Sequence, residues 1–355
     1  MIYFNGIDLE YKQDYLDQIK RTVDSSRVLG GLWSETNLEL SSRLESWIGT
    51  NIVVNSGTNA MLMALEWIES NHDQVHYRVS EYSYFWIWGF LKNRNYTVLK
   101  TTNQVDFETD FTTSDMALEV YIITSHNEIN AREFKRSNRS IVIEDRCQMF
   151  GHHTDLISDI RIYSFSNNKI LQGGEGGALA TNIPDLLSWA RTRSFCDVNP
   201  TRSNPYFFLL GQYRPGQSEL PFKSSISALV SSFLLGQISR LEHTREIRQH
   251  NYHRLTELKF SDYQQQSSEF PLGYPLYIDN LDSKTRLKFQ LFLLNQSIQS
   301  YTGVLPLEHY LNDYYIKNTI MLPVHPQLTD EQITYIINRV KLAYDQIIRI
   351  KNINS

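Results

Sequence analysis

The stretch of sequence that decides the fold spans residues 164–177 and reads SFSNNKILQGGEGG. It holds one lysine, Lys169, and four glycines follow within eight residues. Upstream, an apolar run at 141–143 ends in Glu144 and Asp145, as expected of a strand with an acid at its carboxyl end. Such a pair suits pyridoxal 5'-phosphate (PLP), because the amine can form a Schiff base with the cofactor aldehyde while the carboxylate keeps the ring nitrogen protonated. The pair therefore predicts a PLP site.

A second motif reads NSGTNA at residues 55–60, between a predicted strand at 51–54 and a predicted helix at 58–70. Backbone N–H groups at a helix start favour an anion, and a glycine lets a ligand approach the backbone. In isolation the motif more simply indicates a helix cap by Ser56 or Thr58. Followed by the acid and the lysine in this order, it predicts a phosphate site for the same cofactor.

The distribution of apolar residues indicates the fold class. Strand-like runs alternate with helical patterns, which is typical of βαβ units and a mostly parallel sheet. Beyond the strand at 51–54, we expect strands at 75–79, 96–100, 120–124, 140–143, 160–165 and 178–181. A long helical stretch is expected at 224–258 and a closing helix at 330–347, which Thr329 or Asp330 could cap.

The length and the net charge of the chain limit its number of domains and its possible partners. The 355 residues allow a large α/β domain, placed at 1–235, and a smaller C-terminal domain, placed at 236–355. The 34 basic and 39 acidic residues give a net charge of −5, spread along the chain. This balance argues against nucleic acid or an anionic membrane as a partner.

Targeting and metal signals are weak. The first residues lack the basic start and apolar core of a signal peptide, and no apolar run approaches the roughly 18 residues of a membrane span. The two cysteines have no metal-type spacing, and the adjacent His152 and His153 lack ligand partners close in sequence. We therefore expect a soluble cytoplasmic protein without a metal site.

These motifs resemble those of the DegT/DnrJ/EryC1/StrS family of PLP-dependent nucleotide-sugar aminotransferases, which have the aspartate-aminotransferase fold type I. The resemblance runs from about residue 27 to residue 342 and rests on four segments, at 56–60, 144–148, 164–177 and 321–332. It implies a large domain with a mostly parallel central sheet, followed by a smaller C-terminal α+β domain.

The resemblance also implies roles for three residues near the ring of PLP. Lys169 would form the Schiff base and then carry the proton between the α-carbon of the amine and the cofactor. Asp145 would hold the proton of the ring nitrogen, and Gln148 would lie near the ring hydroxyl. The structural alternatives are a solvated surface lysine and an acid that caps the next helix.

Further residues would bind the rest of the cofactor. The resemblance assigns the phosphate to the hydroxyls of Ser164 and Thr58 and to the backbone amides of Gly57 and Asn59. It makes Tyr84 the ring that stacks on the cofactor, and an aromatic face suits a flat conjugated ring. The other aromatic residues at 82–90 are expected to lie mostly in the core.

The chain departs from the family pattern at two places. Ser166 stands where family members commonly carry histidine, which could alter substrate contacts. Pro221 stands where many members place an asparagine that reaches the phosphate of the neighbouring subunit. Lys223 still offers a cation for the phosphate or for a substrate carboxylate.

The resemblance implies a homodimeric aminotransferase with shared active sites. It would move an amino group, from glutamate as the expected donor, to a nucleotide-linked keto sugar, in the synthesis of amino sugars for surface polysaccharide or related glycoconjugates. Two alternatives stay open: a catalytically silent regulatory or sugar-binding member, and a PLP-dependent deoxysugar dehydratase. The dehydratases that resemble this family replace the lysine with histidine, so the intact Lys169 argues against the second alternative.

Overall fold

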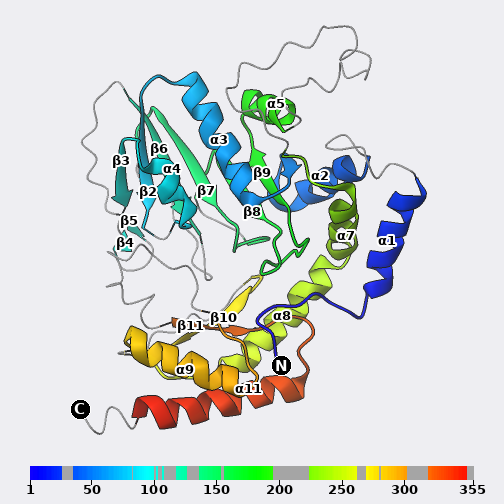
Figure 1. Cartoon of the computed structure of the whole chain (residues 1–355), viewed down its shortest axis with the longest axis vertical. Coiled ribbons are helices and arrows are strands. Elements are labelled where there is room, and N and C mark those ends of the chain that lie inside the picture. The colour runs from blue at the N-terminus through cyan, green and yellow to red at the C-terminus, as the bar shows by residue number, and fades with distance from the viewer. Residues whose placement is uncertain are drawn as a thin grey trace.

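The computed structural model describes most of the chain, in the ranges 1–25, 35–81, 83–99, 101–102, 106–107, 117–125, 136–152, 156–194, 224–261, 269–279, 281–301 and 319–349. Within these ranges the helices and strands fall into an upper and a lower region (Figure 1). The N-terminus lies in the lower region, together with the last described helix.

A seven-stranded sheet forms the centre of the upper region. Its strands are β1 (Asn51–Val54), β2 (Val75–Ser80), β3 (Tyr96–Leu99), β6 (Leu118–Thr124), β7 (Ser140–Asp145), β8 (Ile160–Ser164) and β9 (Gly177–Thr181). They lie in the order β1-β9-β8-β7-β6-β2-β3, and β9 alone runs antiparallel to its neighbours. Two further short strands, β4 (Thr101–Thr102) and β5 (Asp106–Phe107), pair with each other. The mostly parallel sheet predicted from the sequence is confirmed.

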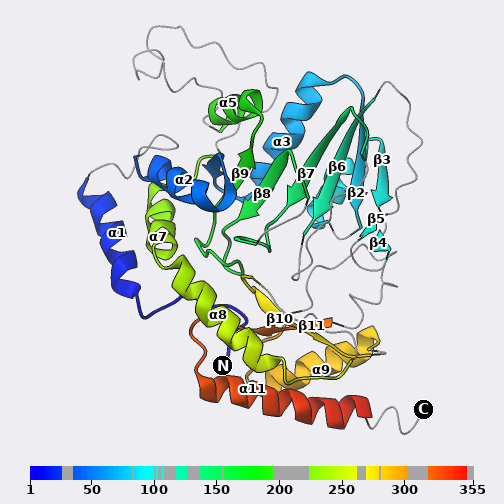
Figure 2. The same cartoon turned by 180° about the vertical axis from the view of Figure 1, so that it is seen from behind.

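Helices cover both faces of this sheet. The helices of the upper region are α1 (Lys12–Asp24), α2 (Glu35–Ile48), α3 (Gly57–Asn71), α4 (Trp86–Leu91), α5 (Pro184–Arg193) and α7 (Ala228–Ile238). Side chains alternate between the faces of a strand, so Ile52 and Val54 pack with α3, α4 and α5, while Val53 packs with α2 and α7. The result is a helix–sheet–helix sandwich (Figures 1 and 2).

The lower region is built on a two-stranded antiparallel sheet. It comprises α8 (Leu241–Leu255), β10 (Gly273–Tyr277), α9 (Ser283–Asn295), β11 (Thr319–Pro323), α11 (Asp330–Ala343) and a π-helical turn, η4 (Tyr344–Arg349). Its apolar core also takes in Ile2, which forms an isolated bridge with Ile298. The N-terminal segment therefore packs with the C-terminal part of the chain.

The helices differ from the sequence prediction at one place and agree with it at another. The single helical stretch expected at 224–258 is wrong, because the chain forms α7 and α8 with a break at Ser239 and Arg240. The cap of the last helix is confirmed: Thr329 accepts a hydrogen bond from the N–H of Gln332, whose side chain accepts from the N–H of Thr329. Within the described ranges, the helices are all too short or too polar to cross a membrane.

Candidate active site

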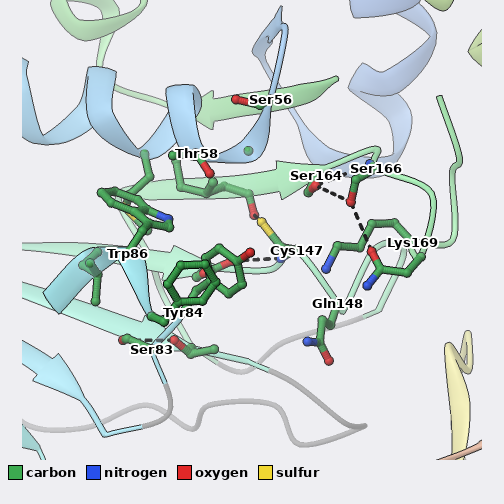
Figure 3. Close-up of a pocket in the computed structure, with 18 of the residues that line it drawn as sticks. Ser56, Thr58, Ser83, Tyr84, Trp86, Cys147, Gln148, Ser164, Ser166 and Lys169 are labelled. Atoms are coloured by element: carbon green, nitrogen blue, oxygen red, sulfur yellow. Dashed lines mark hydrogen bonds between the residues drawn. The ribbon is translucent and has the colours of Figure 1, made fainter. Parts of the chain in front are cut away.

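A cavity of about 790 Å³ opens at the carboxyl ends of the parallel strands, where ligands commonly bind in α/β sheets. Its lining includes seven of the nine residues predicted from the sequence: Gly57, Thr58, Tyr84, Asp145, Gln148, Ser164 and Lys169. These residues come from segments as far apart in the chain as the end of β1 and the loop after β8. The structure therefore brings the main predicted groups together (Figure 3).

The start of α3 forms one wall of the cavity. Ser56 caps the helix, and its hydroxyl accepts a hydrogen bond from the N–H of Asn59 at 3.1 Å. That amide is thus engaged within the helix, and Asn59 is not part of the cavity lining. The first turn carries no acidic residue, so the positive end of the helix dipole is left uncompensated beside Thr58.

Close backbone packing explains the glycines of this wall. A Cβ atom at Gly57 would lie 2.9 Å from the Cβ of Ser164 and 3.0 Å from the Sγ of Cys147. A Cβ atom at Gly177 would lie 2.4 Å from the N of Gly57, closer than any real contact. Only glycine allows β9 and the start of α3 to approach this closely, and this approach places Ser164 beside the helix start.

The acid of the site lies at the end of β7. The Oδ1 of Asp145 accepts a hydrogen bond of 3.0 Å from the N–H of Cys147, which orients the carboxylate. Burial raises the pKa of the Cys147 thiol well above its usual value, and the charge of Asp145 adds to the rise. The thiol therefore stays protonated beside the carboxylate at neutral pH.

Lys169 lies on the loop between β8 and β9, and backbone hydrogen bonds within this loop hold it in shape. The N–H of Lys169 donates to the carbonyl of Ser166 at 3.1 Å, and the N–H of Gly173 donates to the carbonyl of Phe165 at 2.6 Å. Gly174 and Gly176 have φ values of 81° and 113°, which favour glycine. Figure 3 shows the Lys169 side chain reaching from this loop into the space near Cys147 and Tyr84.

Aromatic side chains form the opposite wall. Tyr84 and Phe85 line the cavity with their rings 4.4 Å apart, and they are 48% and 67% exposed. The other aromatic residues of this segment were expected to lie mostly in the core, and Trp86, Trp88 and Phe90 pack partly against it. Phe85 does not follow this expectation, because its side chain is exposed and lines the cavity.

One aromatic residue of the lining was not predicted. Tyr301 comes from the lower region, where its backbone pairs with Met321 and its ring packs on Phe4 at 5.5 Å. Burial raises the pKa of the Tyr301 hydroxyl, and the nearby Tyr84 adds to the rise. Tyr301 was missed because it lies more than 100 residues from the three motifs that predicted the cofactor site, with no local pattern to mark it.

Of the two positions that depart from the family pattern, the structure describes only Ser166. Ser166 lines the cavity and links Ser164 to Asn168: the Ser164 hydroxyl donates to that of Ser166 at 3.4 Å, which donates to Asn168 Oδ1 at 3.1 Å. Pro221 and Lys223 lie outside the described residues, and so does the substrate contact predicted for Lys223.

Comparison with known proteins identifies the family. The model of the DegT/DnrJ/EryC1/StrS aminotransferase family matches residues 129–341, which is more than half of the chain. The chain belongs to this family. No match was found among curated protein sequences.

Solved structures of other proteins share the fold. Spr1654 from Streptococcus pneumoniae, described as a proposed sugar aminotransferase and solved in its PMP form, has 17% identity and a TM-score of 0.78, with 99% of each chain covered. The aminotransferase TlmJ from Streptoalloteichus hindustanus has 15% identity and a TM-score of 0.75, over 98% of this chain and 99% of that one. The sugar aminotransferase CalS13 from Micromonospora echinospora has 17% identity and a TM-score of 0.73, over 96% and 100%. The predicted fold type I is confirmed.

The cavity also fits the cofactor of this family. The start of α3 leaves its dipole uncompensated beside two hydroxyls, those of Thr58 and Ser164, which suits a phosphate. The oriented carboxylate of Asp145 suits a protonated ring nitrogen, and the amine of Lys169 suits an aldehyde. The predictions of an aminotransferase and of PLP as its cofactor are thus confirmed by family membership and agree with the donor set.

Proposed function

We propose that this chain is a sugar aminotransferase that transfers an amino group, from glutamate as donor, to a nucleotide-linked keto sugar. The observation that carries the proposal is the meeting of Lys169, Asp145 and the start of α3 in one cavity. PLP, when bound, supplies an aldehyde that captures amines and a ring that withdraws electrons from the carbon bearing the amine. The protein supplies binding, orientation and proton movement.

Each residue has a role that follows from its position. The amine of Lys169 would hold the cofactor covalently and move the proton at the α-carbon of the donor. Asp145, oriented by the N–H of Cys147, would hold the proton on the ring nitrogen. Tyr84 would cover a face of the ring, and Gln148 would lie near the ring hydroxyl.

The phosphate would lie at the wall formed by α3. Thr58 and Ser164 would donate their hydroxyls, and the backbone amide of Gly57 would add a donor at the positive end of the helix. The role predicted for the amide of Asn59 is the weakest part of this assignment, because that amide already donates to Ser56.

The shape of the cavity supports a sugar as amino acceptor. Its volume of about 790 Å³ leaves room for a ring beside the cofactor, and the aromatic side chains of Phe85, Trp86 and Tyr301 line the same cavity. Aromatic rings pack well on the C–H faces of sugars. Two proteins with the same fold, Spr1654 and CalS13, carry sugar aminotransferase in their names.

We also propose the product, the cellular compartment, the oligomeric state and the domain division of this enzyme. The product would be an amino sugar for surface polysaccharide or a related glycoconjugate, made in the cytoplasm by a homodimer with shared active sites. We further propose a large domain at 1–235 and a small domain at 236–355. The separate apolar core of the lower region supports this division, although Ile2 packs in that core.

The first test of this function is the substitution Lys169→Ala. Purified wild-type protein loaded with PLP should show a visible absorbance band that bleaches on addition of glutamate, and borohydride should fix the cofactor to Lys169. The variant should bind PLP without covalent attachment and lose turnover by at least about 1,000-fold, as expected for loss of the nucleophile.

The control is Lys288→Ala, on the exposed face of α9, which should behave as the wild type. Full activity in the Lys169→Ala variant would refute the proposal. A panel of nucleotide-linked keto sugars, with products detected by mass, would identify the acceptor; no aminated product from any of them would contradict the nucleotide-sugar part.

A further inference from the structure

The N-terminal segment reaches the loop that carries the lysine. The side-chain Nδ2 of Asn5 donates a hydrogen bond of 2.7 Å to the backbone carbonyl of Lys169, 164 residues away in sequence. The N–H of Lys169 donates within its own loop, to the carbonyl of Ser166. Both backbone polar groups of Lys169 are therefore held, one by the loop and one by Asn5.

The orientation of the Asn5 amide is set by its other partners. Its Oδ1 accepts from the N–H of Gly6 at 3.1 Å and from the Nη2 of Arg248 at 2.5 Å. Because both partners are donors, they require the oxygen on their side. The NH2 group must then face the carbonyl of Lys169, so the hydrogen bond to that carbonyl is specific to an amide side chain.

Arg248 anchors this contact in the lower region. It lies on α8, is fully buried, and donates through Nη1 to the carbonyls of Pro271 and Leu272 at 3.2 and 3.3 Å. A buried guanidinium with several partners moves little, because each lost hydrogen bond leaves a buried polar group unpaired. Asn5 thus connects the lysine loop to a rigid point outside the sheet.

A second contact holds the same loop from α7. The backbone N–H of Gln172 donates to the side chain of Gln237, and the Nε2 of Gln237 donates back to the carbonyl of Gln172, each at 2.9 Å. The loop is therefore held at two points three residues apart, Lys169 and Gln172. The contact at Lys169 is the one that acts directly on the residue whose side chain enters the cavity.

We propose that Asn5 is a positioning residue for Lys169. By holding the carbonyl of Lys169 against the N-terminal segment, it fixes the direction in which the amine enters the cavity. This proposal rests on the proposed role of Lys169 and adds that Asn5, in the N-terminal segment, positions that residue from outside the cavity. It also predicts that movement of the lower region is transmitted to the lysine.

The test is the substitution Asn5→Asp. An aspartate keeps an acceptor for Gly6 and Arg248 but places a second oxygen against the carbonyl of Lys169, so the donor is lost and a negative charge is added. In the cofactor-free protein, backbone amide exchange at 169–172 should become about tenfold faster, since one hydrogen bond is worth on the order of 1.4 kcal/mol. With PLP bound, the pH midpoint of the visible band should shift by at least half a unit.

The matched control is Asn251→Asp, one turn along α8 from Arg248. Asn251 is buried, whereas Asn5 is half-buried, and it donates through Nδ2 to the carbonyls of Val324 and His325, away from the loop. It should lower the unfolding temperature but leave loop exchange and the visible band unchanged. If the control changes the loop as much as Asn5→Asp, general loss of stability explains the effect and the proposal fails.

Wild-type loop exchange and an unshifted band in Asn5→Asp would also overturn the proposal. If that variant does not fold, Asn5→Ser replaces it, because its neutral side chain is too short to reach the carbonyl and should give the same two changes. The Lys169→Ala experiment separates the two ideas. A covalent band lost in Lys169→Ala and unchanged in Asn5→Asp refutes the positioning role alone, whereas a band kept in Lys169→Ala refutes the proposed function.

Discussion

Two helix starts in this molecule have opposite electrostatic character. The helix α11 begins with a capping box between Thr329 and Gln332, and its first turn carries Asp330 and Glu331. The helix α3 begins with a single cap, Ser56, and its first turn carries no acid. The start of α3 opens into the cavity, whereas the start of α11 is exposed to solvent.

The difference separates a helix start that stabilises the fold from one that can bind a ligand. Carboxylates in the first turn compensate the positive end of the helix dipole and stabilise the helix. The same carboxylates would repel a phosphate. At α3 the compensating charge is absent from the described residues of the first turn, so an anionic ligand can supply it. Three predictions test this contrast.

The largest effect is expected from Thr58→Asp, which gives α3 the acidic first turn of α11. The new carboxylate should weaken the binding of PLP at least about 100-fold, because it repels the phosphate and compensates the dipole. The cofactor-free protein should be as stable as the wild type or slightly more stable. Titration with PLP, followed by absorbance, measures the first effect, and thermal unfolding measures the second.

The control for this experiment is Thr58→Asn, which has nearly the same shape as aspartate and no charge. It should weaken cofactor binding far less. Equal losses for the two variants would mean that the hydroxyl of Thr58, rather than the charge at the helix start, determines binding.

A smaller effect is expected when the pH is lowered, because a buried histidine lies just before α11. His325 is buried before this helix, and its Nε2 contacts the carbonyl of Tyr3 at 3.0 Å. Burial, helped by the charge of Arg248, lowers the pKa of His325 to about 4. Between that value and about 6.5, the unfolded chain binds more protons than the folded one, so stability is complete above pH 6.5 and falls as the pH decreases.

For His325 the loss between pH 7.5 and pH 5 should be about 2 kcal/mol in the free energy of unfolding. His152, which contacts the carbonyl of Phe270, also has its pKa lowered to about 4 by burial and should add a similar loss. Denaturant unfolding at both pH values measures the total. The variant His325→Gln should reduce the total loss by about 2 kcal/mol, and an unchanged dependence would contradict the assignment.

The smallest effect is expected from Thr329→Ala, which removes the cap of α11. The free energy of unfolding should fall by about 1 kcal/mol, as is typical for loss of an N-cap. The affinity for PLP should not change, because Thr329 is not part of the cavity lining. Weaker cofactor binding in this variant would show that the two helix starts are coupled and do not serve separate purposes.

Local features of the fold could be predicted from the sequence. The strands of the large sheet were expected within one or two residues of their observed ends, because alternation and bounding turns are encoded in a few adjacent residues. The cap at Thr329 was predicted for the same reason. The helices α1 and α2 were not predicted, although each has an amphipathic pattern.

The break between α7 and α8 shows why other features could not be predicted. The apolar pattern continues through Ser239 and Arg240, yet the helix ends there. Arg240 donates to Asp14 at 2.8 Å and lies over the ring of Tyr11, so contacts with residues more than 220 positions away accompany the break. No pattern in the neighbouring residues encodes such a contact.

The sequence by itself determined the chemistry: an acid at a strand end, a lysine among glycines, and a helix start without carboxylates. These features depend on short segments, whose preferences are set by nearby residues. Only the tertiary structure decided that Tyr301 faces the cavity, that Asn59 turns its amide away from it, and that Asn5 holds the carbonyl of Lys169. Such contacts form between distant segments, and they exist only because burial of the apolar cores offsets the entropy of bringing those segments together.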